Sequence, residues 1–124
     1  EIIQRYADIV EDLKMDDEIL TTIDETLELY ISQLSDKPSR LYDALVSCGE
    51  DFNAQLIANY NNNQGIPTRY ISPKEAGLIV TDLPQQAQIL DSSYEHIYKL
   101  RDYKEKLIIP GFFGISKQND IVTL

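Results

Sequence analysis

The sequence has one cysteine, one histidine and few basic residues, and each scarcity excludes a class of function. Cys48 has no partner for an internal disulfide, which fits a reducing compartment, and we expect a cytoplasmic protein. His96 has no second imidazole with which to build a metal site. Eleven Lys and Arg against 21 Asp and Glu give a formal net charge of −10. This charge excludes nucleic acid as a partner, because phosphate binding requires a basic surplus.

Long apolar runs are also missing. No stretch approaches the roughly eighteen apolar residues that a membrane-spanning helix needs, and the negative charge disfavours docking on anionic lipid. No basic segment precedes an apolar one, so no secretory signal is visible. Hydrophobic residues nevertheless make up 43% of the 124 residues, which is enough for one globular domain with a core.

The negative charge is concentrated at the N-terminal end. Residues 1–37 carry eleven acids and three bases, a net charge of −8, which leaves −2 for residues 38–124. Apolar residues recur at helical spacing from Ile2 to Leu13 and again from Ile19 to Leu34. We therefore expect an acidic antiparallel helical hairpin over residues 1–37, within the same domain as the rest.

Residues 38–124 change from helices to strands that alternate with helices. Pro38 restarts a helix, which the small residues at 47–49 are expected to interrupt, and a longer helix follows and ends near Gly65. Capping boxes at residues 72–75 and 92–95 predict two further helix starts. Short strands are predicted at residues 68–71, 78–81, 87–90, 106–110 and 121–123. This order favours an α/β domain with a mostly parallel sheet, in which residues 106–110 form a buried strand.

Two segments carry residues suited to ligand binding. At residues 47–50, Ser-Cys-Gly-Glu, a turn would deliver the carboxylate of Glu50 to the start of a helix. There the carboxylate either caps the helix, worth roughly 0.5–2 kcal/mol, or projects into a cleft and binds an ammonium group, and spacing alone favours the cap. Residues 110–114, Pro-Gly-Phe-Phe-Gly, follow the predicted buried strand, where open α/β sheets bind ligands. An ordinary glycine turn would have the same sequence.

For the remaining candidate site residues, a structural role is a better interpretation than a functional one. His96 reads as a residue on a helix surface, and Cys48 lacks a base that would activate its thiol. The acids at residues 11–12 and 16–18 lack the ligand spacing of a calcium loop, so a solvated helix face is the better interpretation.

The order of the motifs resembles the aspartate kinases, a branch of the amino-acid-kinase family. Residues 45–50 look like the Ser-x-Gly-Glu motif of these enzymes, and a helix ending in Gln-Gly-Ile-Pro at residues 64–67 follows, as in the family. Residues 109–114 resemble the family's Pro-Gly-Phe-x-Gly segment. Residues 122–124 are similar to the Thr-Thr-Leu that leads into its Gly-Arg-Gly-Gly-Ser-Asp loop. Each motif is modest alone, but their succession is specific, whereas the hairpin matches in position only.

The resemblance implies an αβα sandwich of which this chain is an interior piece. The full-length parent would use ATP and Mg²⁺ to phosphorylate the side-chain carboxylate of L-aspartate, the entry step to lysine, threonine and methionine synthesis. By position, Glu50 would contact the ammonium group of the substrate or orient a catalytic lysine. Phe112 would line the aspartate pocket, and Thr123 would lie at its rim. Ser47 and Gly111 complete the predicted substrate-binding set.

The family's Lys-Phe-Gly-Gly-Thr-Ser segment, which holds its catalytic lysine, and its glycine-rich loop are not among the 124 residues. We therefore assign no catalytic residue to this chain and expect it to be inactive alone and to bind no cofactor, while the parent forms a homo-oligomer. Two alternatives stay open. One is another amino-acid kinase, acting on glutamate or carbamate. The other is a non-catalytic module whose acidic hairpin binds a basic partner. Fusion of the parent to homoserine dehydrogenase is also open.

Overall fold

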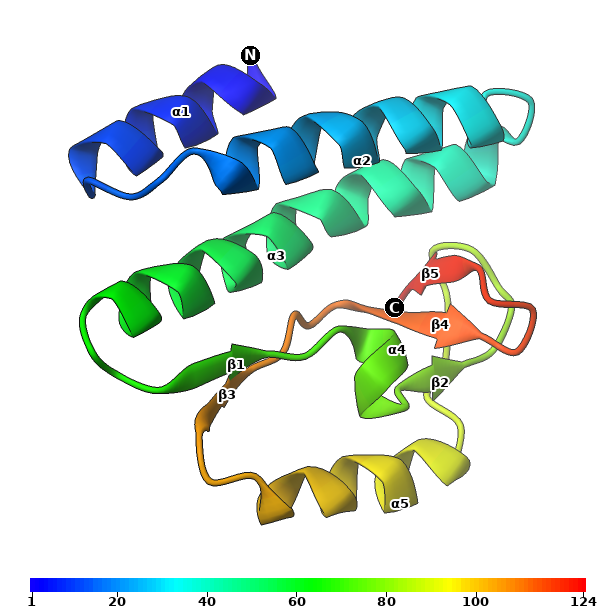
Figure 1. Ribbon diagram of the computed structural model, residues 1–124. Helices are drawn as coiled ribbons and strands as arrows, with labels where there is room; N and C mark the ends of the chain where they lie inside the picture. The colour runs from blue at the N-terminus through cyan, green and yellow to red at the C-terminus, as the bar shows by residue number, and fades with distance from the viewer.

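Three helices open the chain, and short strands and helices alternate after them. In order, the elements are α1 (Ile2–Asp12), α2 (Glu18–Leu34), α3 (Pro38–Asn63), β1 (Thr68–Tyr70), α4 (Pro73–Ala76), β2 (Ile79–Val80), α5 (Ser92–Lys99), the 3₁₀ turn η1 (Leu100–Asp102), β3 (Lys106–Ile108), β4 (Phe113–Ser116) and β5 (Ile121–Thr123). The computed structural model describes all residues 1–124. Figure 1 shows α3 between the α1–α2 pair and the strands, with α5 on the opposite side of the strands. The chain therefore has the predicted α/β class.

The antiparallel helices α1 and α2 pack on the outer side of α3 (Figure 1). Ile23 of α2 has no exposed surface and lies at the centre of their shared core. The ring of Tyr6 meets the ring of Phe52 edge-on, with centroids 6.0 Å apart. The core is completed by Val10, Ile19, Cys48 and Leu56. Because each buried aliphatic or aromatic side chain contributes about 1.5–3 kcal/mol, this cluster holds the acidic hairpin firmly on α3.

The helix α3 is one continuous helix of 26 residues, so the predicted interruption at residues 47–50 is wrong. Ser47 and Cys48 satisfy their side chains inside the helix, each donating to the carbonyl oxygen of Ala44, at 2.8 and 3.2 Å. Gly49 weakens the helix only locally, and the buried side chains on either side of it outweigh its low helix propensity.

The C-terminal end of α3 lies where the sequence predicted it. Gly65 adopts a left-handed conformation with φ of 77°. The N–H of Ile66 donates to the carbonyl of Asn61 at 2.9 Å, and the N–H of Gly65 donates to Asn62 at 3.0 Å. This pair of bonds is a Schellman motif, which satisfies carbonyls that the end of a helix would otherwise leave free.

The strands form two small sheets. β1 pairs with β3 in parallel, while β4 is the centre of a second sheet, parallel to β2 and antiparallel to β5. Two of the three ladders are thus parallel, in agreement with a mostly parallel arrangement. β3 was expected to be deeply buried and is not, because it pairs only with β1 and exposes Lys106.

The buried strand is β4, which sequence reasoning missed. Residues 110–114 were interpreted as either a ligand-binding segment or an ordinary glycine turn, and no strand was predicted there, but β4 begins at Phe113, which is 3% exposed. A Cβ on Gly114 would lie 2.5 Å from Val80 Cγ1, so this glycine serves the close approach of β2 and β4. The strand predicted at residues 87–90 forms only a single bridge, between Val80 and Ile89.

One of the two predicted capping boxes forms. At α4 the Ser72 hydroxyl accepts the N–H of Glu75 at 3.2 Å, and the Glu75 carboxylate accepts the N–H of Ser72 at 3.0 Å. At α5, no side-chain cap forms. Ser93 instead bonds both the N–H and the carbonyl of Ile79 at 2.8 Å and ties α5 to β2. None of the helices combines the length and hydropathy that crossing a membrane requires.

Two glycines test the packing in opposite directions. Gly77 has a φ of 72°, and a Cβ there would lie 2.4 Å from Cβ of His96. Gly77→Ala should therefore lower the free energy of unfolding by more than the roughly 1–2 kcal/mol of a left-handed alanine. Gly49→Ala is the matched control: it lies within α3 and would meet nothing within 4 Å, so it should raise stability by about 0.5–1 kcal/mol. Urea unfolding monitored by circular dichroism measures both, and equal midpoints for the two variants would contradict this packing.

Candidate functional site

The two predicted residues of α3, Ser47 and Glu50, share a helix face with Asp43, because spacings of four and three residues return to the same side of a helix. Asp43 has no exposed surface and Ser47 is 2% exposed, whereas Glu50 is exposed. This face of α3 is therefore buried at Asp43 and Ser47 and exposed to solvent at Glu50.

The position of Glu50 removes one of its two interpretations. α3 begins at Pro38, so no helix start lies at residue 50 for this carboxylate to cap. Glu50 takes part in none of the four ion pairs of the chain. Its carboxylate is therefore exposed and without a cationic partner, as a group that binds an ammonium ion requires.

The second predicted segment is a sharp entry into β4. Gly111 and Phe112 are exposed, and Phe112 has a φ of 73° with 46% of its surface exposed. A phenylalanine in the left-handed region costs about 1–3 kcal/mol and persists only where neighbouring structure enforces it. That constraint comes from β5, since the N–H of Leu124 donates to the carbonyl of Phe112 at 2.9 Å.

Thr123 lies inside the structure, 2% exposed, opposite Phe113 in the β4–β5 ladder. Its hydroxyl donates to Asp43 at 3.1 Å and its N–H donates to Asp43 at 3.0 Å. Its carbonyl accepts the N–H of Ala87 at 3.0 Å. The hydroxyl thus points to α3, and a role of Thr123 at the rim of a substrate pocket stays a prediction.

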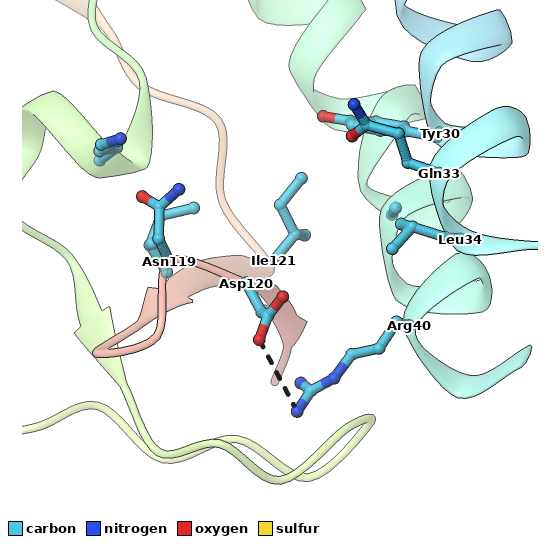
Figure 2. Close-up of a pocket in the computed structure, with 10 residues that line it drawn as sticks. Tyr30, Gln33, Leu34, Arg40, Asn119, Asp120 and Ile121 are labelled. Atoms are coloured by element: carbon cyan, nitrogen blue, oxygen red, sulfur yellow. Dashed lines mark ion pairs between the residues drawn. The ribbon is translucent and has the colours of Figure 1, made fainter. Parts of the chain in front are cut away.

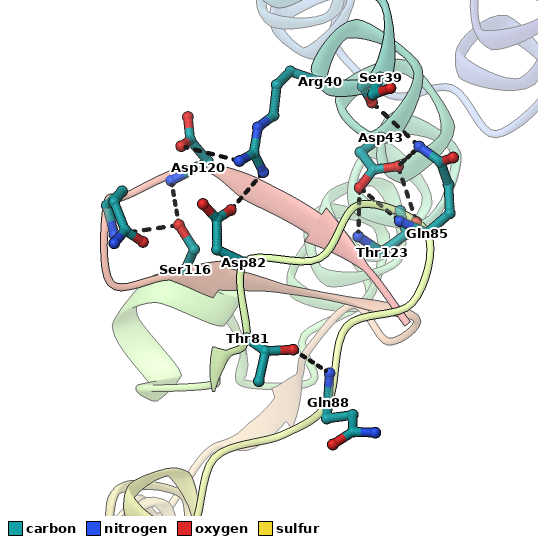
Figure 3. Close-up of polar contacts among 11 residues, drawn as sticks. Ser39, Arg40, Asp43, Thr81, Asp82, Gln85, Gln88, Ser116, Asp120 and Thr123 are labelled. Carbon is teal, nitrogen blue, oxygen red and sulfur yellow. Dashed lines mark hydrogen bonds and ion pairs between the residues drawn. The ribbon is translucent and has the colours of Figure 1, made fainter.

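Asp43 is the functional candidate that sequence reasoning missed. It accepts four hydrogen bonds, two from Thr123 and two from Gln85, as Figure 3 shows. The available signal was its spacing: Asp43 lies four residues before Ser47 and therefore on the same side of the helix.

A cavity of about 310 Å³ lies between α2, α3 and the β4–β5 turn (Figure 2). The Arg40 guanidinium on its wall lies 2.6 Å from the carboxylate of Asp82 and 4.0 Å from that of Asp120. The hydrogen bond to Asp82 raises the pKa of Arg40. Because two carboxylates compensate this charge, the cavity offers no free arginine to an anion.

A smaller cavity of about 200 Å³ shares Tyr30 and Lys74 with the first and reaches Ser47. In its wall the Tyr70 hydroxyl donates to Asp51. Burial raises the pKa of the Asp51 carboxyl, against the hydrogen bonds that lower it, and burial together with Asp51 raises the pKa of Tyr70. Burial also raises the pKa of Tyr30 to about 12.

Ser47 and Glu50 lie on α3, Thr123 lies on β5, and Gly111 and Phe112 lie in the segment directly before β4. These segments come together because α3 packs against β5 and β5 pairs with β4. Of the five, Ser47 lines the smaller of the two cavities described above, and the other four line neither. The structure therefore brings the two motif segments to one side of the strands without enclosing Glu50 and Phe112 in a common pocket. No group of three His, Cys, Asp or Glu side chains is placed to hold a metal ion.

Comparison with known proteins gives a consistent family. The model of the amino acid kinase family matches residues 2–123. Aspartokinase 3 of Bacillus subtilis is 39% identical over 122 residues, which cover 98% of this chain and 27% of that relative. The crystal structure of Clostridium acetobutylicum aspartate kinase matches 99% of this chain with a TM-score of 0.68 and 28% identity, over 25% of that structure's chain.

A third comparison concerns the fold alone. Aspartokinase III of E. coli, crystallised with aspartate and ADP, matches 94% of this chain and 25% of its own, with a TM-score of 0.66 and 19% identity. The present chain thus spans about a quarter of the length of the relatives it matches.

Cys48, inside the first motif, provides a pH-dependent test of the site's packing. Burial raises the pKa of its thiol to about 11, and the nearby Asp51 adds to the shift. Because the folded chain keeps the thiol proton to a higher pH than the unfolded chain, whose thiol has a pKa of about 8.5, stability falls as pH rises from about 8.5 towards 11. Wild type should lose roughly 1–2 kcal/mol more than Cys48→Ala between pH 8 and pH 10, measured by urea unfolding. Parallel pH profiles for the two proteins would show that Cys48 is not buried as described.

Proposed function

The chain belongs to the amino acid kinase family, and from this premise we propose that the protein is an aspartate kinase. It transfers the terminal phosphoryl group of ATP, with Mg²⁺, to the side-chain carboxylate of L-aspartate. This is the first step towards lysine, threonine and methionine. A cytoplasmic, homo-oligomeric parent belongs to the same proposal. Its support is the 39% identity to a Bacillus subtilis aspartokinase across 98% of the chain and the ordered motifs at residues 45–50, 109–114 and 122–124.

The observation that carries the proposal is the setting of Glu50. The carboxylate is exposed, lies in mid-helix and has no cationic partner within the chain. A charge-assisted hydrogen bond to an ammonium group is the interaction for which this carboxylate is free. We assign it to the α-ammonium group of aspartate, which leaves the side-chain carboxylate of the substrate to face the phosphoryl donor.

The second motif, at residues 109–114, provides surface against which the substrate can pack. The exposed ring of Phe112 offers an apolar wall, and apart from the two neighbouring residues of the chain nothing lies within 4 Å of where a Cβ of Gly111 would be. The backbone there is open to close approach by a ligand. Phosphoryl transfer depends on alignment and on neutralising the charge of the phosphates. The residues described here contribute alignment of the acceptor, and the neutralising groups belong to other parts of the parent.

The distribution of charge agrees with a chain that aligns the acceptor while other parts of the parent neutralise the phosphates. The eleven acids of residues 1–37 lie in the α1–α2 hairpin and the turns that flank it, and the hairpin covers the side of α3 that faces away from the strands (Figure 1). An acidic surface repels a nucleoside triphosphate. Because the acidic hairpin lies on the far side of α3, this repulsion is weaker on the strand side, where the motifs meet. The relatives matched are aspartokinases, which favours aspartate over glutamate or carbamate as the acceptor.

Substitution of Glu50 in the full-length protein tests the proposal. Glu50→Gln keeps the size of the side chain and removes its charge, and we expect the aspartate KM to rise roughly tenfold to a hundredfold, as for loss of a charged hydrogen bond. The ATP KM should change little. Glu28→Ala, which removes an exposed acid on α2, is the matched control. Aspartate KM and kcat near wild type in Glu50→Gln would leave Glu50 as a solvated surface residue.

The 124 residues by themselves should not turn over ATP. They hold substrate-side residues but neither the family's lysine-bearing segment nor its glycine-rich loop. A coupled assay for ADP release with ATP, Mg²⁺ and aspartate should give the same rate for this chain and for its Glu50→Ala variant. A rate above that of the variant would show that the chain contains a working site.

A further inference from the structure

We propose that Asp43 is a positioning residue for the aspartate site: it fixes the helix that carries Glu50 against the β4–β5 pair, directly before which Phe112 lies. The inference rests on the proposed function, since the site it serves is the one assigned to aspartate.

Asp43 holds the β5 end and one loop with both of its oxygens. Oδ2 accepts the N–H of Thr123 at 3.0 Å and the N–H of Gln85 at 3.2 Å, while Oδ1 accepts the Thr123 hydroxyl at 3.1 Å and the Gln85 side-chain amide at 2.9 Å (Figure 3). The carboxylate has no exposed surface and forms no ion pair. A buried charge is tolerated only where hydrogen bonds replace its hydration, so all four bonds are needed together.

These bonds join segments that are remote in sequence. Asp43 and Thr123 are 80 residues apart. Thr123 pairs with Phe113, and the next residue, Leu124, donates its N–H to the carbonyl of Phe112. A displacement of Thr123 is therefore transmitted directly to the strained backbone of Phe112.

On the other side, Asp43 and Glu50 share one helix and lie seven residues apart. At 1.5 Å per residue this is a rise of about 10 Å along a continuous helix. The separation of Glu50 and Phe112 is thus set by two stiff links, α3 and the β4–β5 ladder, and by the bonds of Asp43 that connect them.

The loop at residues 82–87 is the second segment that is hydrogen-bonded to Asp43. Gln85 has a φ of 60°, a left-handed conformation that costs a non-glycine residue free energy, and both of its N–H groups named above donate to Asp43. Its side-chain amide also reaches the carbonyl of Ser39 at 3.4 Å. The ion pairs of Arg40 with Asp82 and Asp120 join the same elements (Figure 3), but these carboxylates are 34% and 42% exposed. Exposed ion pairs hold weakly, so the buried Asp43 is the main constraint.

The chemistry of the cluster provides a rescue variant. In Asp43→Asn the carbonyl oxygen can accept both backbone N–H groups, from Thr123 and Gln85. The new amide can donate to the Thr123 hydroxyl and to the Gln85 side chain, because a hydroxyl rotates and an amide can turn over. The four contacts of residue 43 then persist without the charge, while the turned Gln85 amide gives up only its 3.4 Å bond to the Ser39 carbonyl. Asp43→Ala loses all four.

The test uses the full-length protein and measures kcat, the aspartate KM and the ATP KM, with folding checked by thermal unfolding. We expect Asp43→Ala to raise the aspartate KM by at least about tenfold with little change in the ATP KM, since it removes alignment of the acceptor only. Asp43→Asn should stay near wild type, and Thr123→Val, which loses one of the four bonds, should fall between them. Ile23→Ala is the matched control, because Ile23 is fully buried in the hairpin core and remote from this cluster. It should lower the melting temperature and leave both KM values unchanged.

The outcomes separate the two proposals. An Asp43→Ala protein that melts lower but keeps both KM values would show a structural residue only and overturn this inference, while aspartate kinase activity of the wild type would leave the proposed function standing. If Asp43→Ala does not fold, Thr123→Val decides, and an unchanged aspartate KM there overturns the inference. A wild type that phosphorylates no aspartate overturns both.

Discussion

The structure depends on α3 being buried on two sides at once. Towards the hairpin it contributes Cys48, Phe52 and Leu56 to an apolar cluster, and towards the strands it presents Asp43 and Ser47. These two demands are met on one rigid helix, so the hairpin and the strands are placed relative to each other without touching extensively. The continuity of α3 through Gly49 is what makes the arrangement possible, because a break there would separate Asp43 from the position of Glu50.

Patterns that depend on local chemistry were predictable from the sequence. The apolar stripes of α1 and α2, the Gly65 helix end and the Ser72 capping box follow from periodicity or from side chains a few residues apart. Features decided by distant neighbours were not predictable. Gly49 looked like a break because nothing local shows the core that spans it. β4 looked like a turn because the need for Gly114 arises from its contact with Val80, which lies far away in the sequence.

The candidate site shows the same division. The motifs identified Ser47 and Glu50 on α3, and Gly111, Phe112 and Thr123 in or beside the β4–β5 pair, but not Asp43, which links α3 to that pair. An aspartate among helix residues is usually solvated, and only the strand end that arrives from residue 123 turns it into a buried acceptor. The sequence also did not predict the positive φ of Phe112, because a sequence pattern assigns this conformation to the neighbouring Gly111.

The central claim is that the free carboxylate of Glu50 binds the ammonium group of aspartate. Its most direct test is calorimetric binding of aspartate and of succinate, which lacks the amine, to full-length wild type and to Glu50→Gln. If the two charges meet, loss of the amine weakens binding strongly in wild type and only slightly in Glu50→Gln, a coupling of about 1 kcal/mol or more. The same aspartate-to-succinate ratio in both proteins would mean that Glu50 and the ammonium group do not interact, and would contradict the account.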